Sequence, residues 1–516
     1  MCMTTNEQTN VPSNVSPNAP SAHAETNAQT QVIRDRLNIP RQPVPKQKPG
    51  ERIQNFDETY LRMDMDAAIV EAARCIDCPS APCTQACPVH NDIPSALKLL
   101  EDGDFLGAAG VFRQTSTLPE MCGRLCPQES LCEGACVVGF AIRPDGTHHP
   151  PVAIGRLESF ITDSERQEVG RFPVRFTAPS TGRSVAIVGS GPAGMTVAEE
   201  LQARGHSCTI FDMWPEPGGV LRYGIPNFKM SKEILEGKLQ ALRDMGVTFV
   251  NNTRVGKDIS LVDLHDRDDF DAIFIGTGAG VGNQLRLEGE ELANVYQATD
   301  FLVRGNLRPE ELPEGQREKP YIGTDVVVVG GGDTSMDCVR TAIRLGAENV
   351  TCVYRRTEKE MLGRAEERTH AKEEGVNFAY LTTPLRFLGD AEGNVSGVEM
   401  VKMELTEPDE SGRRRPVPVE GSEYVLPASA VVVAVGYGAD AEFAETAPVT
   451  ANRWGLISVD ERTGQTNIPY IFAGGDVVNG ADLVVTAIAD GKRASTWLHQ
   501  YLTQMGPKVE ETEVEI

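Results

Sequence analysis

The chain has 516 residues, 40% of them hydrophobic, with 49 Gly, 33 Pro and a formal net charge of -25. Its length predicts several domains of ordinary size. Affinity for nucleic acid and for anionic membranes comes from Lys and Arg, so the acidic charge argues against both as partners. No stretch approaches the roughly 18 apolar residues of a membrane helix, and the polar N-terminus lacks a signal-peptide pattern, so we expect a cytoplasmic protein.

Three stretches of different character follow one another along the chain. Residues 1–50 are rich in Asn, Ser, Thr and Pro, which predicts a disordered N-terminal tail. Residues 51–178 carry apolar side chains at helical spacing, as in DAAIVEAARC, which predicts a helical domain. From Ser184 onward short β-branched runs alternate with helical stretches, which predicts parallel sheets with helical crossovers.

Eight of the 12 cysteines lie in the helical stretch, in two groups. Their spacings are Cys75-x2-Cys78-x4-Cys83-x3-Cys87-Pro88 and Cys122-x3-Cys126-Pro127-x4-Cys132-x3-Cys136. Eight thiolates make two sets of four, which is what two iron–sulfur clusters need, and a Cys-Pro cysteine ligates the other cluster in two-cluster ferredoxins. Zinc sites usually repeat C-x2-C on both sides, and disulfides are rare in a reducing compartment. We therefore predict iron–sulfur clusters.

A dinucleotide fingerprint opens the α/β part. In SVAIVGSGPAGMTVAEEL, Gly189, Gly191 and Gly194 follow a predicted strand and begin a helix. They permit the turn, the approach of a pyrophosphate to the backbone, and close packing of helix on strand. The helix N-terminus favours the anion. Asp212 ends the next predicted strand, where an acid binds a ribose hydroxyl.

The pattern recurs in VVVVGGGDTSMDCV. Gly330, Gly332 and Ser335 occupy its three fingerprint positions. The next predicted strand ends in Arg355 and Arg356, where an acid would select NAD. Guanidinium groups there can pair with a 2′-phosphate, which favours NADP, although a solvated basic turn is the alternative.

Two further stretches place the second unit inside the first. IFAGGDVV supplies Gly474 and Asp476 after a strand, with Asp476 positioned for a ribityl or phosphate-side hydroxyl. The strand–glycine stretches AIFIGTGAG and VVVAVGYGAD flank the second unit, as expected where a chain crosses twice between two domains.

These residues give the chain a family resemblance. Over about residues 55–500 it resembles the small (beta) subunits of bacterial NADPH-dependent glutamate synthase, through LPEMCGRLCPQESLCEGAC, PGGVLRYGIPNFKM, GGGDTSMDCVRTAIRLGA and DLVVTAIADGK. Related proteins are the N-terminal half of dihydropyrimidine dehydrogenase and the large subunit of a ferredoxin:NADP transhydrogenase. The resemblance implies an α/β fold of two Rossmann-like dinucleotide-binding domains, the second inserted in the first, preceded by an α-helical domain with two Fe–S clusters.

The resemblance also implies domain limits and cofactors. FAD would bind residues 179–305 and 440–516, NADPH would bind residues 306–439, and residues 51–178 would hold two [4Fe–4S] clusters. One cluster would use Cys75, Cys78, Cys83 and Cys136, and the other Cys87, Cys122, Cys126 and Cys132. The quoted runs add four candidate cofactor-binding residues: Gly219, Arg222, Asp333 and Thr334.

One run departs from the family pattern. Many members carry Met-Pro-Gly-Ser-Arg-Arg after the paired arginines, whereas this chain has Met361-Leu362-Gly363-Arg364-Ala365-Glu366. Two basic residues are lost and Arg364 restores only one positive charge, which weakens the predicted preference for NADPH over NADH.

The implied function is electron input. NADPH would be oxidised at FAD, and the clusters would pass the electrons to a large (alpha) subunit that makes L-glutamate from L-glutamine and 2-oxoglutarate. Hydride transfer between the cofactors needs no side-chain acid or base, so no catalytic residue is predicted. The alternatives are an electron-transfer module of a ferredoxin:NADP transhydrogenase or pyrimidine reductase, and a non-catalytic zinc-binding assembly protein with vestigial nucleotide folds.

Overall fold

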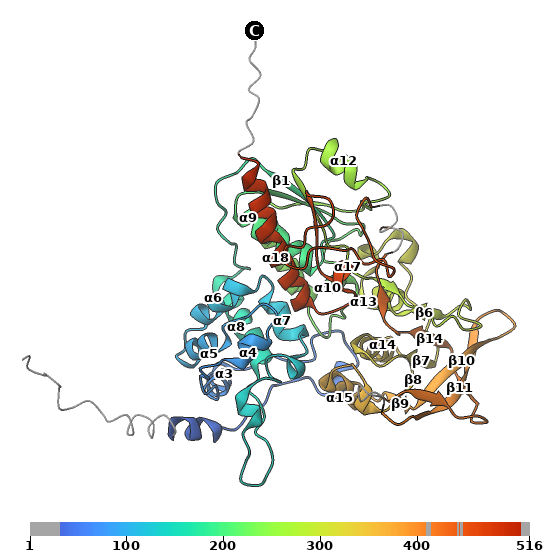
Figure 1. Cartoon of the computed structure of the whole chain (residues 1–516). Coiled ribbons are helices and arrows are strands. Elements are labelled where there is room, and N and C mark those ends of the chain that lie inside the picture. The colour runs from blue at the N-terminus through green and yellow to red at the C-terminus, as the bar shows by residue number, and fades with distance from the viewer. Residues whose placement is uncertain (1–30, 409–413, 441–442, 444–446, 507–516) are drawn as a thin grey trace, which may run out of the picture.

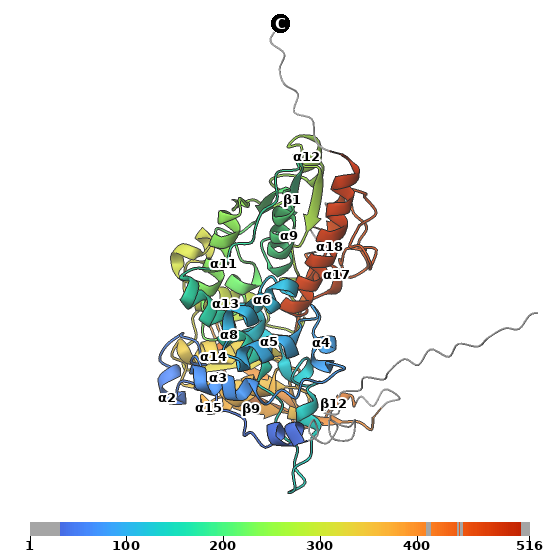
Figure 2. The same cartoon turned by 90° about the vertical axis from the view of Figure 1, so that its left-hand side faces the viewer.

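The computed structural model describes residues 31–408, 414–440, 443 and 447–506. A helical part, an α/β part with the long helix α18, and a second α/β part meet in the middle of the molecule (Figure 1). The view turned by 90° shows that helices of the helical part lie beneath α9 and above α15 (Figure 2). None of the described helices combines the length and the apolar character that a membrane span requires.

The helical part consists of short helices around one core. They are α3 (Met65–Ala72), α4 (Pro82–Ala86), α5 (Ile93–Glu101), α6 (Phe105–Thr115), α7 (Pro119–Leu125), α8 (Ile154–Val169) and the 3-10 turns η1 (Gln128–Ser130) and η2 (Val137–Phe140). Asp64, Asp92 and Asp104 cap α3, α5 and α6, because each carboxylate accepts a backbone N–H of the first turn. Leu97 and Phe112 are buried in the core.

The first α/β part contains a parallel sheet in the order β16-β4-β1-β2-β3. Its strands are β1 (Ser184–Val188), β2 (Ser207–Phe211), β3 (Thr248–Val250), β4 (Ala272–Ile275) and β16 (Ile471–Ala473), and its helices are α9 (Pro192–Ala203), α10 (Val220–Tyr223), α11 (Lys232–Asp244), α12 (Leu261–Asp266), α17 (Asp476–Asn479) and α18 (Val484–Gln504). Gly491 lets α18 approach α9, since a side chain there would lie 2.8 Å from the carbonyl oxygen of Ala193.

The second α/β part contains a second parallel sheet in the order β6-β14-β7-β8-β9. Its elements are β6 (Val295–Gln297), α13 (Ala298–Asn306), η3 (Pro309–Glu311), η4 (Glu314–Gln316), β7 (Asp325–Val329), α14 (Asp333–Arg344), β8 (Asn349–Tyr354), η5 (Glu358–Glu360), α15 (Ala365–Glu373), β9 (Asn377–Tyr380) and β14 (Ala430–Val433). An antiparallel layer adds β10 (Thr382–Gly389), β11 (Val395–Leu405), β12 (Pro416–Pro418) and β13 (Tyr424–Pro427).

The second part is inserted in the first, as predicted. Strand β16, which completes the first sheet, follows all strands of the second sheet in the sequence. The two crossings pair with each other as β5 (Val281–Gly282) and β15 (Tyr437–Gly438). Strand β6 pairs with β14, so the second sheet begins at Val295, before the predicted limit at residue 305/306.

Residues 31–50 differ from the expected disordered tail. Residues 31–37 are helical, and α2 (Pro49–Arg52) follows. Arg36 donates to the carbonyl oxygens of Ala73 and Cys75 and pairs with Glu101. These long-range contacts order a segment whose composition alone indicates disorder. The rest of the predicted tail, residues 1–30, lies outside the described residues.

Candidate cofactor and cluster sites

The first glycine-rich loop has the geometry of a dinucleotide cradle. Gly189, with φ +99°, turns the chain after β1, and Gly191 caps α9. A side chain at Gly194 would overlap the carbonyl oxygen of Gly189, so helix and loop pack closely. A side chain at Gly191 would meet no protein atom within 4 Å. The space in front of the α9 N-terminus is therefore open, as a bound pyrophosphate requires.

Asp212 lies directly beside this loop. Its carboxylate accepts the backbone N–H of Ser190 at 2.8 Å, the Ser190 hydroxyl, and the backbone N–H of Trp214 at 3.0 Å. Burial raises the pKa of Asp212. The contact with Ser190 was not predicted, because an x position of the fingerprint carries no chemical requirement.

Two other predicted segments converge on the same loop. Gly219 has φ +52°, and a side chain there would lie 2.8 Å from Cα of Gly191. A side chain at Gly475 would lie 3.1 Å from Cβ of Ala193 at the start of α9. The next residue, Asp476, begins α17, and burial raises its pKa to about 6.

Asp490 of α18 supports the Gly474–Asp476 loop and was missed by sequence reasoning. Its carboxylate accepts the backbone N–H of Gly475 at 2.9 Å and the side-chain amide of Asn479 at 2.6 Å. It also pairs with Arg493 at 2.6 Å. Asp490 is 14 residues beyond Asp476, inside the run DLVVTAIADGK that carries the resemblance, but nothing in that run indicates a contact with Gly475. Only the fold brings the two together.

Arg222 differs from the other candidates in its surroundings. Its guanidinium is 2% exposed, donates to the carbonyl oxygen of Pro217 at 2.8 Å, and pairs with Glu236 and Glu311. The structure thus places Arg222 as a support of the Gly219 turn, and its contact with a cofactor stays a prediction.

The second glycine-rich loop repeats the first. Gly330, with φ +148°, follows β7, and Gly332 caps α14. A side chain at Gly332 would again meet no protein atom within 4 Å. Ser335, at the third fingerprint position, is fully buried and donates to the carbonyl oxygen of Ala434 at 3.4 Å. The first turn of α14 presents Asp333 and Thr334, both half-buried.

Arg355 and Arg356 follow β8 on the same side as this loop. Arg355 is exposed, and Arg356 is half-buried with an Nε atom that is buried without a hydrogen-bond partner. Within the described part of the chain, neither side chain has an ion-pair partner. The buried Nε of Arg356 without a partner and the neighbouring guanidinium of Arg355 without a carboxylate fit a phosphate ligand.

Residues 361–364 lie against the second loop. The backbone N–H of Gly363 donates to the carbonyl oxygen of Gly331 at 2.9 Å, and that of Arg364 donates to Asp333 at 3.0 Å. A side chain at Gly363 would lie 3.1 Å from the carbonyl carbon of Gly332. The run that departs from the family pattern is thus part of the predicted NADPH site.

The eight clustered cysteines form two groups in space. Around one cavity lie four of them, here called the outer set: Cys75, Cys78, Cys83 and Cys136. The other four, here called the inner set, are Cys87, Cys122, Cys126 and Cys132. The charge interactions between one thiol and another run within each set, and the crossed ligand assignment implied by the resemblance stays a prediction.

The two sets have apolar surroundings that suit a cluster. The wall of the outer cavity includes Ile93, Leu97 and Val138. Burial raises the pKa of Cys75 to about 12 and that of Cys83 to about 11, so these thiols become thiolate ligands only when a metal stabilises the anion. No three His, Cys, Asp or Glu side chains in the described part of the chain are arranged to hold a metal ion directly. A four-iron cluster spreads its ligands more widely than a single zinc ion does.

Glu158 of α8 is a buried carboxyl group beside the inner set. Its charge raises the pKa of Cys87 and of Cys132, and Asn91 donates to it at 3.3 Å. Burial, reinforced by Glu120, raises the pKa of Glu158 to about 8. Sequence reasoning missed this residue, because it is one of several acidic residues of an amphipathic helix.

The inner set lies next to the first dinucleotide fold. Cys122 and Cys126 belong to the same hydrophobic core as Ala193 and Val197 of α9. The hydroxyl groups of Thr117 and Thr196 are 2.7 Å apart across this boundary. Several members of the outer set instead belong to the core of the helical part.

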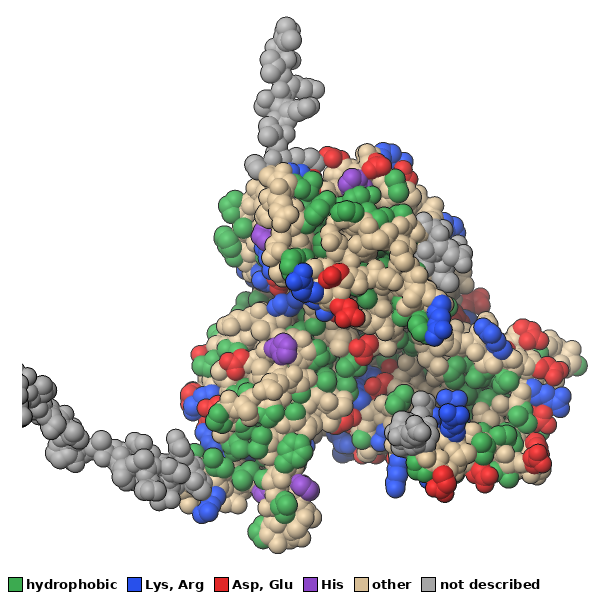
Figure 3. All heavy atoms as spheres, in the orientation of Figure 1, with side chains coloured by type: hydrophobic (Ala, Val, Ile, Leu, Met, Phe, Trp, Pro, Cys, Tyr) green, Lys and Arg blue, Asp and Glu red, His purple; other side chains and the backbone are tan. Residues whose placement is uncertain are grey.

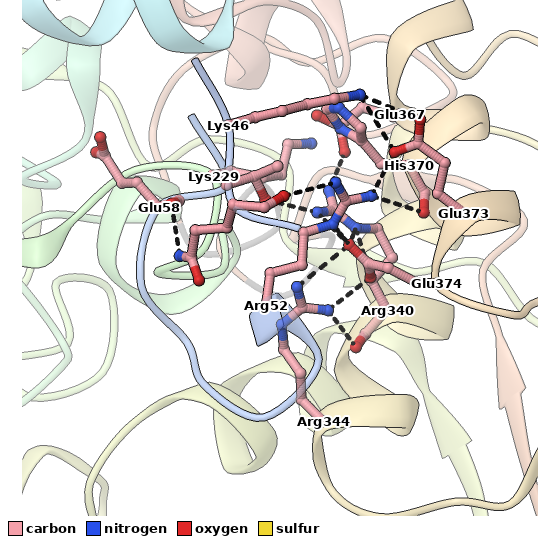
Figure 4. Close-up of polar contacts among 12 residues, drawn as sticks. Lys46, Arg52, Glu58, Lys229, Arg340, Arg344, Glu367, His370, Glu373 and Glu374 are labelled. Atoms are coloured by element: carbon pink, nitrogen blue, oxygen red, sulfur yellow. Dashed lines mark hydrogen bonds and ion pairs between the residues drawn. The ribbon is translucent and has the colours of Figure 1, made fainter. Parts of the chain in front are cut away.

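Charged side chains join the second α/β part to the segment before the helical part (Figure 4). Glu374 is buried between three arginines and pairs with Arg52 at 2.6 Å, Arg340 at 2.9 Å and Arg344 at 2.7 Å. Arg340 also donates to Thr59 at 2.7 Å. The network ties α14, which begins at the second loop, to the segment before the helical part.

The chain matches known families along most of its length. Residues 183–491 match the family described as pyridine nucleotide-disulphide oxidoreductase, and residues 52–169 match dihydropyrimidine dehydrogenase domain II, 4Fe-4S cluster. The chain is 41% identical over 473 residues to the glutamate synthase (NADPH) small chain of Escherichia coli (strain K12), covering 90% of this chain and 98% of that one. The chain belongs to the family of glutamate synthase small chains.

Other relatives of the chain have about the same sequence identity to it. The small chain of Azospirillum brasilense is 40% identical, covering 89% of this chain and 94% of that one. The putative oxidoreductase AegA of Escherichia coli (strain K12) is 41% identical, covering 93% of this chain and 73% of that one. Among solved structures, FprA of Mycobacterium tuberculosis in complex with NADPH shares the fold, with a TM-score of 0.52 and 22% identity over 63% of this chain and 85% of that chain. The predicted family and fold class are confirmed.

Proposed function

We propose that this chain is the electron-input subunit of a glutamate synthase. It would oxidise NADPH at FAD and pass electrons through two [4Fe–4S] clusters to a large subunit that forms L-glutamate from L-glutamine and 2-oxoglutarate. The observation that carries the proposal is the shared core of the inner cysteine set and helix α9. It sets a cluster-type thiol group directly against a dinucleotide cradle, which is the arrangement that electron transfer between them requires.

In this proposal the protein binds and orients its cofactors. Gly191 and Gly332 leave room for the two pyrophosphates, and the helix N-termini behind them favour the negative charge. Arg355 and Arg356 would hold the 2′-phosphate of NADPH. Bound FAD would accept a hydride and release its electrons one at a time, which is chemistry that no side chain provides.

The proposed electron route runs from the flavin to the inner set and then to the outer set. The inner set adjoins α9, and the outer set is further along, with Cys75 and Cys78 half-exposed. The outer set would therefore be the exit. After Cys136 the surface carries Phe140, which ends η2, and Ile142, and their side chains are 62% and 68% exposed. The loop that follows η2 protrudes from the helical part (Figure 1). An electron-accepting subunit could cover such an apolar loop.

The experiment that tests this function is anaerobic co-purification with the large amidotransferase subunit encoded in the same genome, followed by a coupled assay. We expect NADPH oxidation that depends on both L-glutamine and 2-oxoglutarate. A chain that reduces its flavin with NADPH but neither binds the large subunit nor supports this assay would overturn the proposal.

A second function is favoured by one observation. The chain is as similar to AegA as to the glutamate synthase small chain, at 41% identity in both cases. In that alternative the same NADPH, flavin and cluster route serves a different acceptor protein. NADPH-dependent reduction of ferredoxin, without activity in the glutamate synthase assay, would favour it. Either function fits the cytoplasmic location that we propose.

A further inference from the structure

Arg364 connects the proposed NADPH loop with a predicted cluster ligand in another part of the chain. It precedes α15, and its backbone N–H donates to Asp333, the first residue of α14, at 3.0 Å. Its side chain crosses to the helical part, where Nη1 donates to the carbonyl oxygen of Cys126 at 3.2 Å. Cys126 belongs to the inner set. One residue thus contacts both the nucleotide loop and the backbone of a cysteine of the inner set, which we assign to the first cluster on the route.

The contact is buried and held from several sides. Arg364 is 5% exposed, and its Nη2 donates to Glu367 at 3.1 Å. The next residue strengthens the junction, because the backbone N–H of Ala365 donates to Glu129 at 3.2 Å. The Nε atom of Arg364 is buried, lies 3.6 Å from Asp333, and makes no hydrogen bond.

Arg364 is surrounded by several charged groups. Its nearest carboxylate, Glu367, also pairs with Arg340 at 2.5 Å. Although burial opposes both shifts, the charges of Lys229, Arg340 and Arg364 lower the pKa of Glu367, while Glu367, Asp333, Glu366 and Asp337 raise the pKa of Arg364. Replacing Arg364 alone by a neutral residue therefore leaves these carboxylates with less compensation. Asp333, which accepts the backbone N–H of Arg364, belongs to the helix start that follows the nucleotide loop. A guanidinium in this position adds positive potential at the inner set.

We propose that Arg364 is a positioning residue that raises the reduction potential of the inner cluster and links that potential to occupancy of the NADPH loop. The inference rests on the proposed function, because it requires a cluster on the inner set. A reduced cluster carries one more negative charge than an oxidised one, so a nearby buried cation stabilises the reduced form. NADP⁺ brings phosphate charge to the loop that Asp333 and Arg364 share, which draws positive charge from Cys126 and lowers the potential. By linkage, reduction of the cluster weakens NADP⁺ binding by the same factor.

The test is an EPR-monitored redox titration of the purified holoprotein, with and without NADP⁺. The signal of the inner cluster is identified as the one that Cys126→Ala removes. We expect Arg364→Gln to lower the potential of the inner cluster, to leave that of the outer cluster unchanged, and to reduce the shift caused by NADP⁺. Arg364→Lys, which keeps the charge, should lie closer to the wild type than Arg364→Gln does.

Arg368→Gln is the matched control. Arg368 supports the same loop by donating to the carbonyl oxygens of Met361 and Gly363, and among the described residues it has no hydrogen bond to the helical part. Its loss should leave both cluster potentials unchanged. Equal inner-cluster potentials in the wild type and Arg364→Gln, at equal iron content, would overturn the inference. A wild type without cluster signals would instead overturn the proposed function, so the two failures are distinguishable.

Discussion

At the scale of single residues, the two open glycines distinguish a ligand site from a structural turn. Gly191→Ala and Gly332→Ala place a methyl group where the structure has no protein atom within 4 Å. The fold should tolerate both changes, while the bound pyrophosphate should not. We expect FAD affinity in the first variant, and NADPH affinity in the second, to fall by about 1–3 kcal/mol, or about 5- to 150-fold.

Flavin content and NADPH titration measure these losses, and the thermal unfolding temperature checks the fold. Gly110→Ala is the control, since position 110 is also open but lies in α6, outside both loops. A Gly191→Ala variant that retains a full complement of FAD would contradict the assignment of the first loop.

The paired arginines make a second prediction at this scale. Arg356→Gln, combined with Arg355→Gln, removes the proposed partners of the 2′-phosphate. Charged hydrogen bonds contribute about 1.5–3 kcal/mol each, so kcat/KM for NADPH should fall about 10- to 150-fold per arginine, while that for NADH stays unchanged. Steady-state flavin reduction with both nucleotides measures this. Arg415→Gln, an exposed arginine between β11 and β12, should change neither value. Parallel losses with NADPH and NADH would argue for the solvated-turn alternative.

Residues of the candidate sites were predictable where the chemistry is local. The glycines of each loop and the cysteines of each group lie within short runs, so spacing alone indicates them. The residues that support them were not predictable: Asp490 reaches Gly475, and Arg364 reaches Cys126, only because helices from distant parts of the sequence pack together. Arg222 was named from its run, but its neighbours in space are Glu236 and Glu311.

At the scale of elements, the interface of α14 and α15 with the segment around α2 depends on Glu374. This carboxylate is fully buried among Arg52, Arg340 and Arg344. Removing one partner of a buried ion pair costs about 3–5 kcal/mol, because the remaining charges stay buried. Glu374→Gln should therefore lower the free energy of unfolding by about that amount at pH 7. Glu373→Gln, at the neighbouring position where the side chain is 32% exposed, should cost less than about 1 kcal/mol.

The pH dependence of Glu374 has a definite sign. Although burial opposes it, Arg344 and Arg340 lower the pKa of Glu374 to about 2. A lowered carboxyl pKa means that the stabilisation is complete above the unfolded-state pKa of about 4.3 and is lost as the pH falls toward 2. Unfolding followed by circular dichroism between pH 2 and 7 should show this acid loss in the wild type and in Glu373→Gln. If Glu374→Gln retains the full loss, the network does not act as described.

The elements themselves were predictable to different extents. Strands β1, β4 and β7 are runs that contain β-branched residues and precede a glycine, and the structure has them where expected. Residues 31–50 were expected to be disordered from their composition. Their order comes from Arg36 and other long-range contacts, which composition does not reveal. The limit at 305/306 was misplaced because β6 is only three residues long and has no pattern of its own.

At the scale of the whole molecule, the proposed route has a defined order, which mutation of the outer set can test. Cys78→Ala removes a half-exposed thiol of the outer set, a proposed cluster ligand, and leaves the inner set and both nucleotide loops intact. We expect flavin reduction by NADPH to stay within about twofold of the wild type, whereas electron transfer to the large subunit is lost. Stopped-flow absorbance measures the first step and the coupled assay the second. Undiminished transfer to the large subunit would show that electrons leave before the outer set.

The surface of the molecule is hollowed between its two α/β parts (Figure 3), and the crossings β5 and β15 lie at the junction of these parts. NADPH and FAD bound to their proposed loops would approach each other across this junction. The network around Glu374 holds the C-terminal end of α14 against the segment around α2.

The late position of β16 has a consequence for biosynthesis. The first sheet and the Gly474–Asp476 loop are incomplete until residues 471–476 have left the ribosome, although the helical part and the inserted sheet have by then been translated. Long-range pairing of this kind forms slowly, and domains generally fold in the order of synthesis. Iron–sulfur assembly on the nascent helical part can therefore precede flavin uptake. A chain arrested before β16 would be expected to carry iron but no flavin.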